Sequence, residues 1–123
     1  MQIIKADIMG YCMGVRRAVE SAEKAIQDFP HKNIFTLGPL IHNQNALDML
    51  EAKGVKVLSI KDDIFSHKID ENSVVIVRAH GVAPKVIKTL EKTGCKIINA
   101  TCPRVLSNQK RAADFAKRKF IVI

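Results

Sequence analysis

The chain has 123 residues and 47% of them are hydrophobic, which is enough for one domain, or slightly more, with a core of its own. No apolar run approaches the length of a membrane span, and residues 1–5 lack a secretory-signal pattern, so we expect a cytoplasmic protein. Three widely spaced cysteines do not form a disulfide framework, and reduced thiols or metal ligands are the better interpretation.

The net charge is +8, from 20 basic and 12 acidic residues. Such a balance favours a solvated basic surface over a nucleic-acid patch, because the few aromatic residues are not interleaved with basic ones. An anionic substrate or an acidic protein partner fits the charge equally well. The densest basic group is Lys110, Arg111, Lys117, Arg118 and Lys119.

Strand-like and helix-like segments alternate along the chain. The patterns predict a strand over 2–8, a helix over 14–28, a strand over 33–37, a helix over 44–53 and a strand over 55–58. A polar surface excursion over 59–73 follows. The remaining segments are a strand over 74–78, a helix from Pro84 to Gly94, a strand over 96–100, a helix over 103–118 and a strand over 120–123.

This βα alternation predicts an α/β fold, in which a parallel sheet carries helices on both faces. A strand directly after the last helix usually begins a new unit, so we also expect the chain to be the front part of something longer.

Two cysteines occupy the same kind of position in this pattern. Cys12 follows the first expected strand and Cys102 follows the strand over 96–100, and a helix begins directly after each. Helix N-termini carry partial positive charge and free N–H groups, which favour the thiolate that binds metal or attacks a substrate. The alternative is a pair of ordinary buried cysteines. Cys95 begins the strand that Cys102 follows, so the length of that strand separates the two thiols and they cannot bind one small cluster. We therefore predict that Cys95 is a small buried apolar residue.

Two histidines also follow expected strands. His42 comes after the strand over 33–37, and His80 comes after the strand over 74–78. Ligands of open parallel sheets bind beyond the carboxyl ends of the strands, so the pair is typical of an anion or substrate site. Either histidine alone would more often be a surface or capping residue. No nucleotide-binding glycine motif is present, because residues 10–14 lack the G-x-G-x-x-G spacing.

Four segments, in order, carry a resemblance to a known family. They are Gly10-Tyr11-Cys12-Met13-Gly14-Val15-Arg16-Arg17-Ala18, Leu40-Ile41-His42-Asn43, Arg78-Ala79-His80-Gly81-Val82 and Asn99-Ala100-Thr101-Cys102-Pro103. Together they resemble the motifs of 4-hydroxy-3-methylbut-2-enyl diphosphate reductases, the iron–sulfur enzymes of the last step of the non-mevalonate isoprenoid pathway. The resemblance runs over nearly the whole chain but covers less than half of the family's usual length.

The resemblance implies three α/β units around a central [4Fe-4S] cluster, with one cysteine ligand from each unit. Cys12 and Cys102 match the first two ligands, and His42 and His80 match histidines that hold the substrate diphosphate. Residues 1–100 would form the first unit and 101–123 the start of the second. The implied reaction is a reductive dehydroxylation that yields isopentenyl and dimethylallyl diphosphate, with electrons from ferredoxin or flavodoxin.

Other parts of the family's site have no match here. The third cysteine ligand, a third histidine and the proton-donating glutamate are expected beyond residue 123, so we expect this chain to be inactive alone. Two alternatives remain open: a small basic α/β module that binds nucleotide or RNA without redox chemistry, and a scaffold fragment without a ligand. Salt-sensitive RNA binding would favour the module, and an air-sensitive brown colour would favour the reductase.

Overall fold

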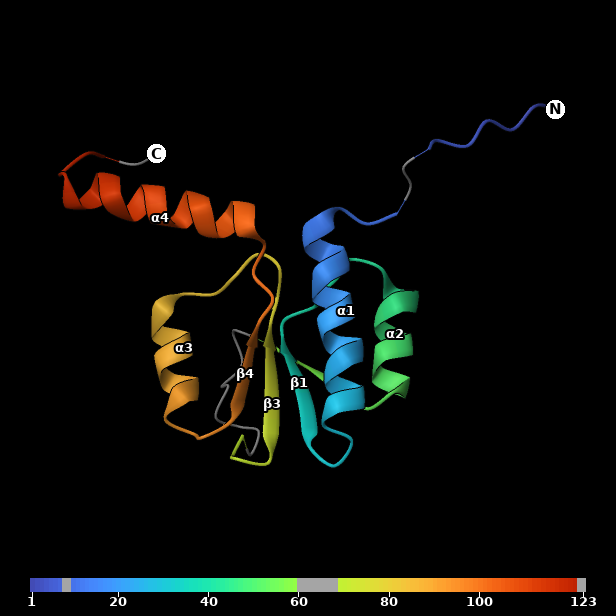
Figure 1. The fold of residues 1–123 in the computed structure, drawn as a ribbon, viewed down its shortest axis with the longest axis horizontal. Helices are drawn as coiled ribbons and strands as arrows, with labels where there is room; N and C mark the ends of the chain where they lie inside the picture. The colour runs from blue at the N-terminus through green and yellow to red at the C-terminus, as the bar shows by residue number, and fades with distance from the viewer. Residues whose placement is uncertain (8–9, 60–68, 122–123) are drawn as a thin grey trace.

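The structure is a computed structural model that describes residues 1–7, 10–59 and 69–121. Its body is a four-stranded sheet with helices packed on both sides, and its two ends extend away from that body (Figure 1). The elements are α1 (Met13–Asp28), β1 (Asn33–Leu37), α2 (Gln44–Ala52), β2 (Val55–Leu58), β3 (Ser73–Val77), α3 (Pro84–Glu91), β4 (Lys96–Asn99) and α4 (Pro103–Lys117).

The four strands are parallel and lie in the order β2-β1-β3-β4. From β1 the chain crosses through α2 to one side, whereas from β3 it crosses through α3 to the other side. Because crossovers are right-handed, connections that run in opposite directions place their helices on opposite faces. The order therefore reverses between β1 and β3, the two central strands. The α/β class and the helices on both faces are confirmed.

Each face of the sheet has its own apolar core. On one face, α1 contributes three fully buried alanines, Ala18, Ala22 and Ala25, whose small side chains let the helix approach the strands closely. On the opposite face, Leu90 of α3 is completely buried against β1 and β3. The side chains of β3 alternate between these two cores, as the period of a strand requires. Burial of all five of its residues identifies β3 as a central strand.

Most predicted elements end within one residue of the observed bounds, but the first strand does not form. Residues 2–7 are without strand structure, and Ile8 lies outside the described residues. The segment extends away from the sheet (Figure 1), and the side chains of Ile3 and Ile4 are 73% and 84% exposed. A strand is stable only when a neighbour pairs with its backbone. None of the four described strands pairs with this segment.

The strand predicted over 120–123 is also wrong for the residues that the structure describes, Phe120 and Ile121. The chain instead ends α4 with a Schellman-type cap. Lys119 adopts a left-handed φ of 62°, and the Phe120 N–H donates to the Phe115 carbonyl oxygen at 3.0 Å. The Phe120 ring packs edge-on against Phe115, with centroids 5.8 Å apart. This contact holds Phe120 against the helix that precedes it.

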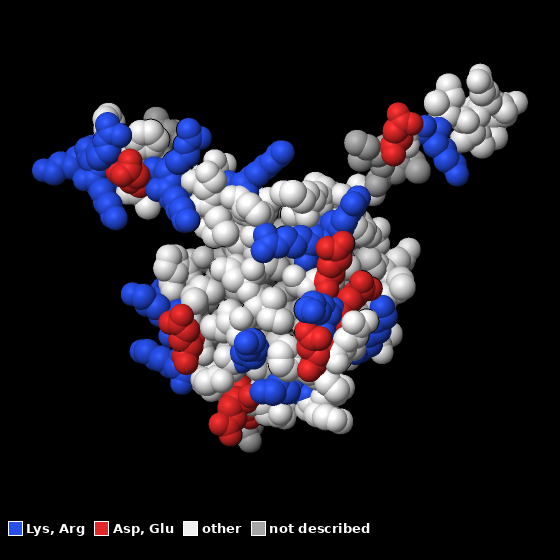
Figure 2. Space-filling model, viewed as in Figure 1, with Lys and Arg blue, Asp and Glu red and all other residues white. Residues whose placement is uncertain are grey.

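Charge is distributed unevenly between the body and α4. On the face in Figure 2, basic and acidic side chains are interspersed over the body, whereas the far end of α4 is mostly basic. The predicted excursion over 59–73 lies largely outside the described residues, which exclude 60–68. Among the residues that the structure describes, no helix combines the length and apolar composition needed to span a bilayer.

Candidate functional site

The connection after β1 places His42 at the carboxyl edge of the sheet. Leu40 and Ile41 are buried, with 2% and 5% of their surfaces exposed, so they anchor this connection in the core. His42 follows them and is exposed. Asn43 then caps α2, and its side-chain oxygen accepts a hydrogen bond from the Ala46 N–H at 3.1 Å. The histidine is therefore held between two buried residues and a helix cap.

The connection after β3 is a tight turn that places His80 beside His42. The Gly81 N–H donates to the Arg78 carbonyl oxygen at 2.9 Å, and Gly81 has a left-handed φ of 73°. Ala79, between Arg78 and His80, is buried. The His42 and His80 rings have centroids 6.2 Å apart and are tilted by 42°. The two histidines that follow β1 and β3 therefore lie beside each other.

Replacing Asn43 with alanine tests how the His42 connection is held. Loss of the cap should lower the free energy of unfolding by about 1 kcal/mol, because the Ala46 N–H loses its acceptor. Urea denaturation would measure the change. Asn45→Ala is a matched control on the exposed surface of α2 and should change stability by less than about 0.5 kcal/mol. Equal effects of the two variants would contradict the capping role.

Cys102 is held by the connection that continues from β4. The Ala100 N–H donates to the Val77 carbonyl oxygen at 3.1 Å, and the Cys102 N–H donates to the Ala79 carbonyl oxygen at 2.9 Å. The chain thus stays paired to the β3 connection beyond the end of both strands. Because Ala79 directly precedes His80, this pairing places Cys102 next to the histidine-bearing turn.

Cys12 lies at the same edge, because α1 begins there. The two cysteines are the N-cap residues of α1 and α4, and neither side chain makes a capping hydrogen bond. Gly14, in the first turn of α1, is buried against Cys102. A Cβ atom added at Gly14 would lie 2.9 Å from Cβ and 3.0 Å from Sγ of Cys102. The first turn of α1 therefore reaches Cys102, and Cys12 lies two residues before the point of contact.

The donor set suits a metal centre only in part. Two thiols that are not used in capping lie at two helix N-termini, and thiol groups are common metal ligands. The close approach at Gly14 leaves no room there for even a methyl group. Within residues 1–7, 10–59 and 69–121, however, no group of three or more Cys, His, Asp and Glu side chains could hold a metal ion. Cys95 is partly buried and packs against the apolar core on the α3 face of the sheet, so it does not supply a third ligand.

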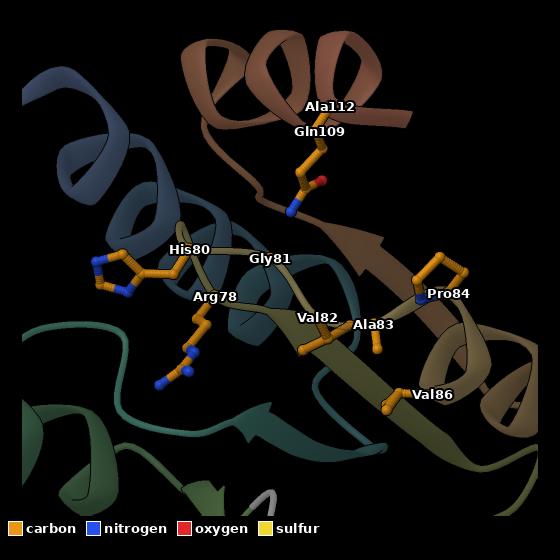
Figure 3. A pocket seen from close by; sticks show the side chains of 9 residues that line it. All are labelled: Arg78, His80, Gly81, Val82, Ala83, Pro84, Val86, Gln109 and Ala112. Atoms are coloured by element: carbon orange, nitrogen blue, oxygen red, sulfur yellow. The ribbon is translucent and has the colours of Figure 1, made fainter. Parts of the chain in front are cut away.

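A hollow of about 640 Å³ opens beside the His80 turn. Figure 3 shows its lining side chains, which come from the connection between β3 and α3, the start of α3, and α4. Sequence reasoning assigned no role to two of them, Arg78 and Gln109. Arg78 is the residue directly after the most apolar strand, and that position is a usable signal. Gln109 gave no signal, because α4 reaches the Gly81 turn only through the fold.

These features define a class of protein: a parallel α/β domain with a histidine pair at the strand-order reversal and a cysteine pair beside it. Ligands of such sheets bind in the crevice at that reversal. The chain belongs to the LytB protein family, whose model matches residues 3–123.

Relatives with assigned names agree with this family. The chain is 40% identical to the 4-hydroxy-3-methylbut-2-enyl diphosphate reductase of Treponema pallidum, over 98% of the chain and 35% of that relative. It is 37% identical to the reductase of the same name from Treponema denticola, over 100% of the chain and 43% of the relative. The chain therefore spans less than half the length of these curated relatives.

Two solved structures are similar in fold. One is a structure of (E)-4-hydroxy-3-methyl-but-2-enyl diphosphate reductase, described as the terminal enzyme of the non-mevalonate pathway. It matches with a TM-score of 0.78 and 33% identity, over 97% of this chain and 40% of that chain. The reductase from Plasmodium falciparum matches with a TM-score of 0.72 and 27% identity, over 92% of this chain and 33% of that chain.

Proposed function

We propose that this chain is part of a 4-hydroxy-3-methylbut-2-enyl diphosphate reductase, an oxidoreductase of isoprenoid biosynthesis. The reaction would be a reductive dehydroxylation that gives isopentenyl and dimethylallyl diphosphate. The observation that carries the proposal is the approach of the first turn of α1 to Cys102, directly beside the histidine pair. The names of the relatives support the same activity.

Cys12 and Cys102 would be two of three cysteine ligands of a [4Fe-4S] cluster, with the third outside this chain. When bound, a cluster with three cysteine ligands would supply electrons and one iron that lacks a protein ligand. The chain's own contribution is positional. Hydrogen bonding to Ala79 fixes the backbone of Cys102, and the absence of a side chain at Gly14 lets the first turn of α1 approach it.

His42 and His80 would bind the substrate diphosphate. Imidazole groups can donate hydrogen bonds to phosphate oxygens, and these two are exposed at the edge of the sheet. The two rings belong to the connections after β1 and β3, on either side of the strand-order reversal. An anion between them would therefore lie at the carboxyl ends of the two central strands. The proton-donating glutamate would be supplied by a part of the enzyme outside this chain.

Residues 1–100 would form the first α/β unit of the enzyme, and 101–123 would begin the second. The four strands and α1 to α3 all fall in the first range, whereas α4 buries none of its residues. We propose that the chain is inactive alone and that ferredoxin or flavodoxin supplies electrons to the complete enzyme.

The RNA- or nucleotide-binding alternative has less support. The basic end of α4 suits it. Its aromatic residues, however, pack on each other and on Arg118, whose guanidinium carbon lies 5.1 Å from the Phe120 ring centroid. Single-strand binding relies on aromatic faces that stack with bases. These two rings are 43% and 55% exposed, but they already contact each other and Arg118.

The test is the iron and sulfide content of the chain after anaerobic reconstitution. We expect Cys12→Ser and Cys102→Ser each to lower bound iron by about tenfold or more, since even changes beyond the ligands weaken metal affinity about 10- to 100-fold. Cys95→Ser is the matched control and should retain its iron, because Cys95 lies in the core at the start of β4.

Iron that survives both junction variants would contradict the ligand assignment, and so would equal loss in all three variants. An unaltered chain that takes up no iron would contradict cluster binding by this chain.

A further inference from the structure

We propose that Arg78 is an additional binding residue for the substrate diphosphate. This inference rests on the proposed function, because it assigns a third cationic group to the anion held by His42 and His80. Arg78 has the right chemistry for this role. Its guanidinium is planar, permanently charged and able to donate two parallel hydrogen bonds to phosphate oxygens.

The first observation is an unused hydrogen-bond donor. The Nε atom of Arg78 is buried and has no hydrogen-bond partner. Buried donors are almost always paired, because an unpaired one has lost its hydration without compensation. Arg78 therefore carries a donor that a ligand could pair if the side chain adjusts on binding. The same side chain lines the hollow beside the turn.

The second observation is the absence of a counter-ion in the described part of the chain. Three ion pairs form there, Lys24–Asp28, Lys53–Glu23 and Arg118–Asp114, and all are at the surface. None includes Arg78. No carboxylate in these pairs compensates the partly buried guanidinium, which can therefore pair with an external anion.

The third observation is the direction of the side chains. Arg78 and His80 belong to one turn and are separated by the buried Ala79. Figure 3 shows both side chains pointing from the connection after β3 toward the same side. His42 faces His80 across the strand-order reversal. The three groups therefore lie at one edge of the sheet, where a diphosphate could contact all of them.

Inorganic pyrophosphate is the probe for the test, which uses this chain and titration calorimetry at low ionic strength. We expect Arg78→Gln to raise the Kd about tenfold to hundredfold, the range for loss of charge-assisted hydrogen bonds. Arg78→Lys should recover part of the affinity, because it keeps the charge but not the paired donors. Lys88→Gln is the control: it removes one exposed charge from α3 and should change the Kd less than about twofold.

A second readout uses only the unaltered chain, so it does not depend on whether a variant folds. In ¹H–¹⁵N spectra of the unaltered chain, the Arg78 Nε–Hε signal should shift when pyrophosphate is added, since this N–H is the unpaired donor. The outcomes separate the two proposals. If His80→Asn weakens binding but Arg78→Gln does not, or if the Nε–Hε signal stays still on binding, the role of Arg78 is overturned and the histidine site stands. If the unaltered chain does not bind pyrophosphate, both are overturned.

Discussion

Replacing Gly14 with alanine should lower the free energy of unfolding by about 1–3 kcal/mol, the usual effect of overpacking. A glycine-to-alanine change in a helix usually stabilises the protein, because alanine is the better helix former by up to about 1 kcal/mol. At Gly14 we expect the opposite effect. The added Cβ would lie 2.9 Å from the Cβ of Cys102 and 3.0 Å from its Sγ. The Cβ atom cannot yield easily, since the Cys102 backbone is hydrogen-bonded to Ala79. Urea denaturation of the purified chain measures the effect.

Met13→Ala is the control for this experiment. Met13 is the neighbouring helix position, 57% exposed, and its replacement should change stability by less than about 0.5 kcal/mol. A Gly14→Ala chain that is more stable than the unaltered one would mean that the first turn of α1 does not touch Cys102. The geometric basis of the cysteine pair would then be lost.

The histidine and cysteine positions could be predicted from the sequence because they depend on one rule. Each of His42, His80 and Cys102 lies in the connection that follows a strand recognisable from its apolar run. Parallel strands end at the same edge, so residues after several strands meet there whatever their separation in the chain. Cys12 lies at the same edge for a different reason, since the strand expected before it does not form. It is there because α1 begins at that edge, and Gly14 records the contact.

The ends of the chain could not be predicted by the same reasoning. An apolar run such as residues 2–8 satisfies the composition of a strand, but pairing depends on a neighbour that composition does not supply. At the other end, Phe120 reads as part of a strand, yet its contact with Phe115 and the left-handed Lys119 continue the helix cap. The cap at Lys119 could not be predicted from the sequence, because the left-handed residue of such a cap is usually glycine. The unpaired Nε of Arg78 is likewise a property of packing and has no sequence signal.

Leu90→Ala should have the largest effect on stability, a loss of about 2–5 kcal/mol. Leu90 is the fully buried residue of α3 and fills the core between that helix and the two central strands. The informative comparison is a chain that ends at Cys102. That chain lacks α4, a helix of 15 residues that buries none of them, and should lose less than about 1 kcal/mol.

Urea denaturation of both variants under the same conditions tests the proposed division between residues 1–100 and 101–123. Stability in the first unit depends on side chains buried between α1, α2, α3 and the sheet. The contacts that tie α4 to that unit include the Cys102 hydrogen bond to Ala79, the packing of Gly14 on Cys102 and the approach of Gln109 to Gly81. The shortened chain keeps the two that involve Cys102. A shortened chain that loses as much stability as Leu90→Ala would place α4 within the first unit. The division at residue 100 would then be wrong, because the stability of the first unit would depend on α4.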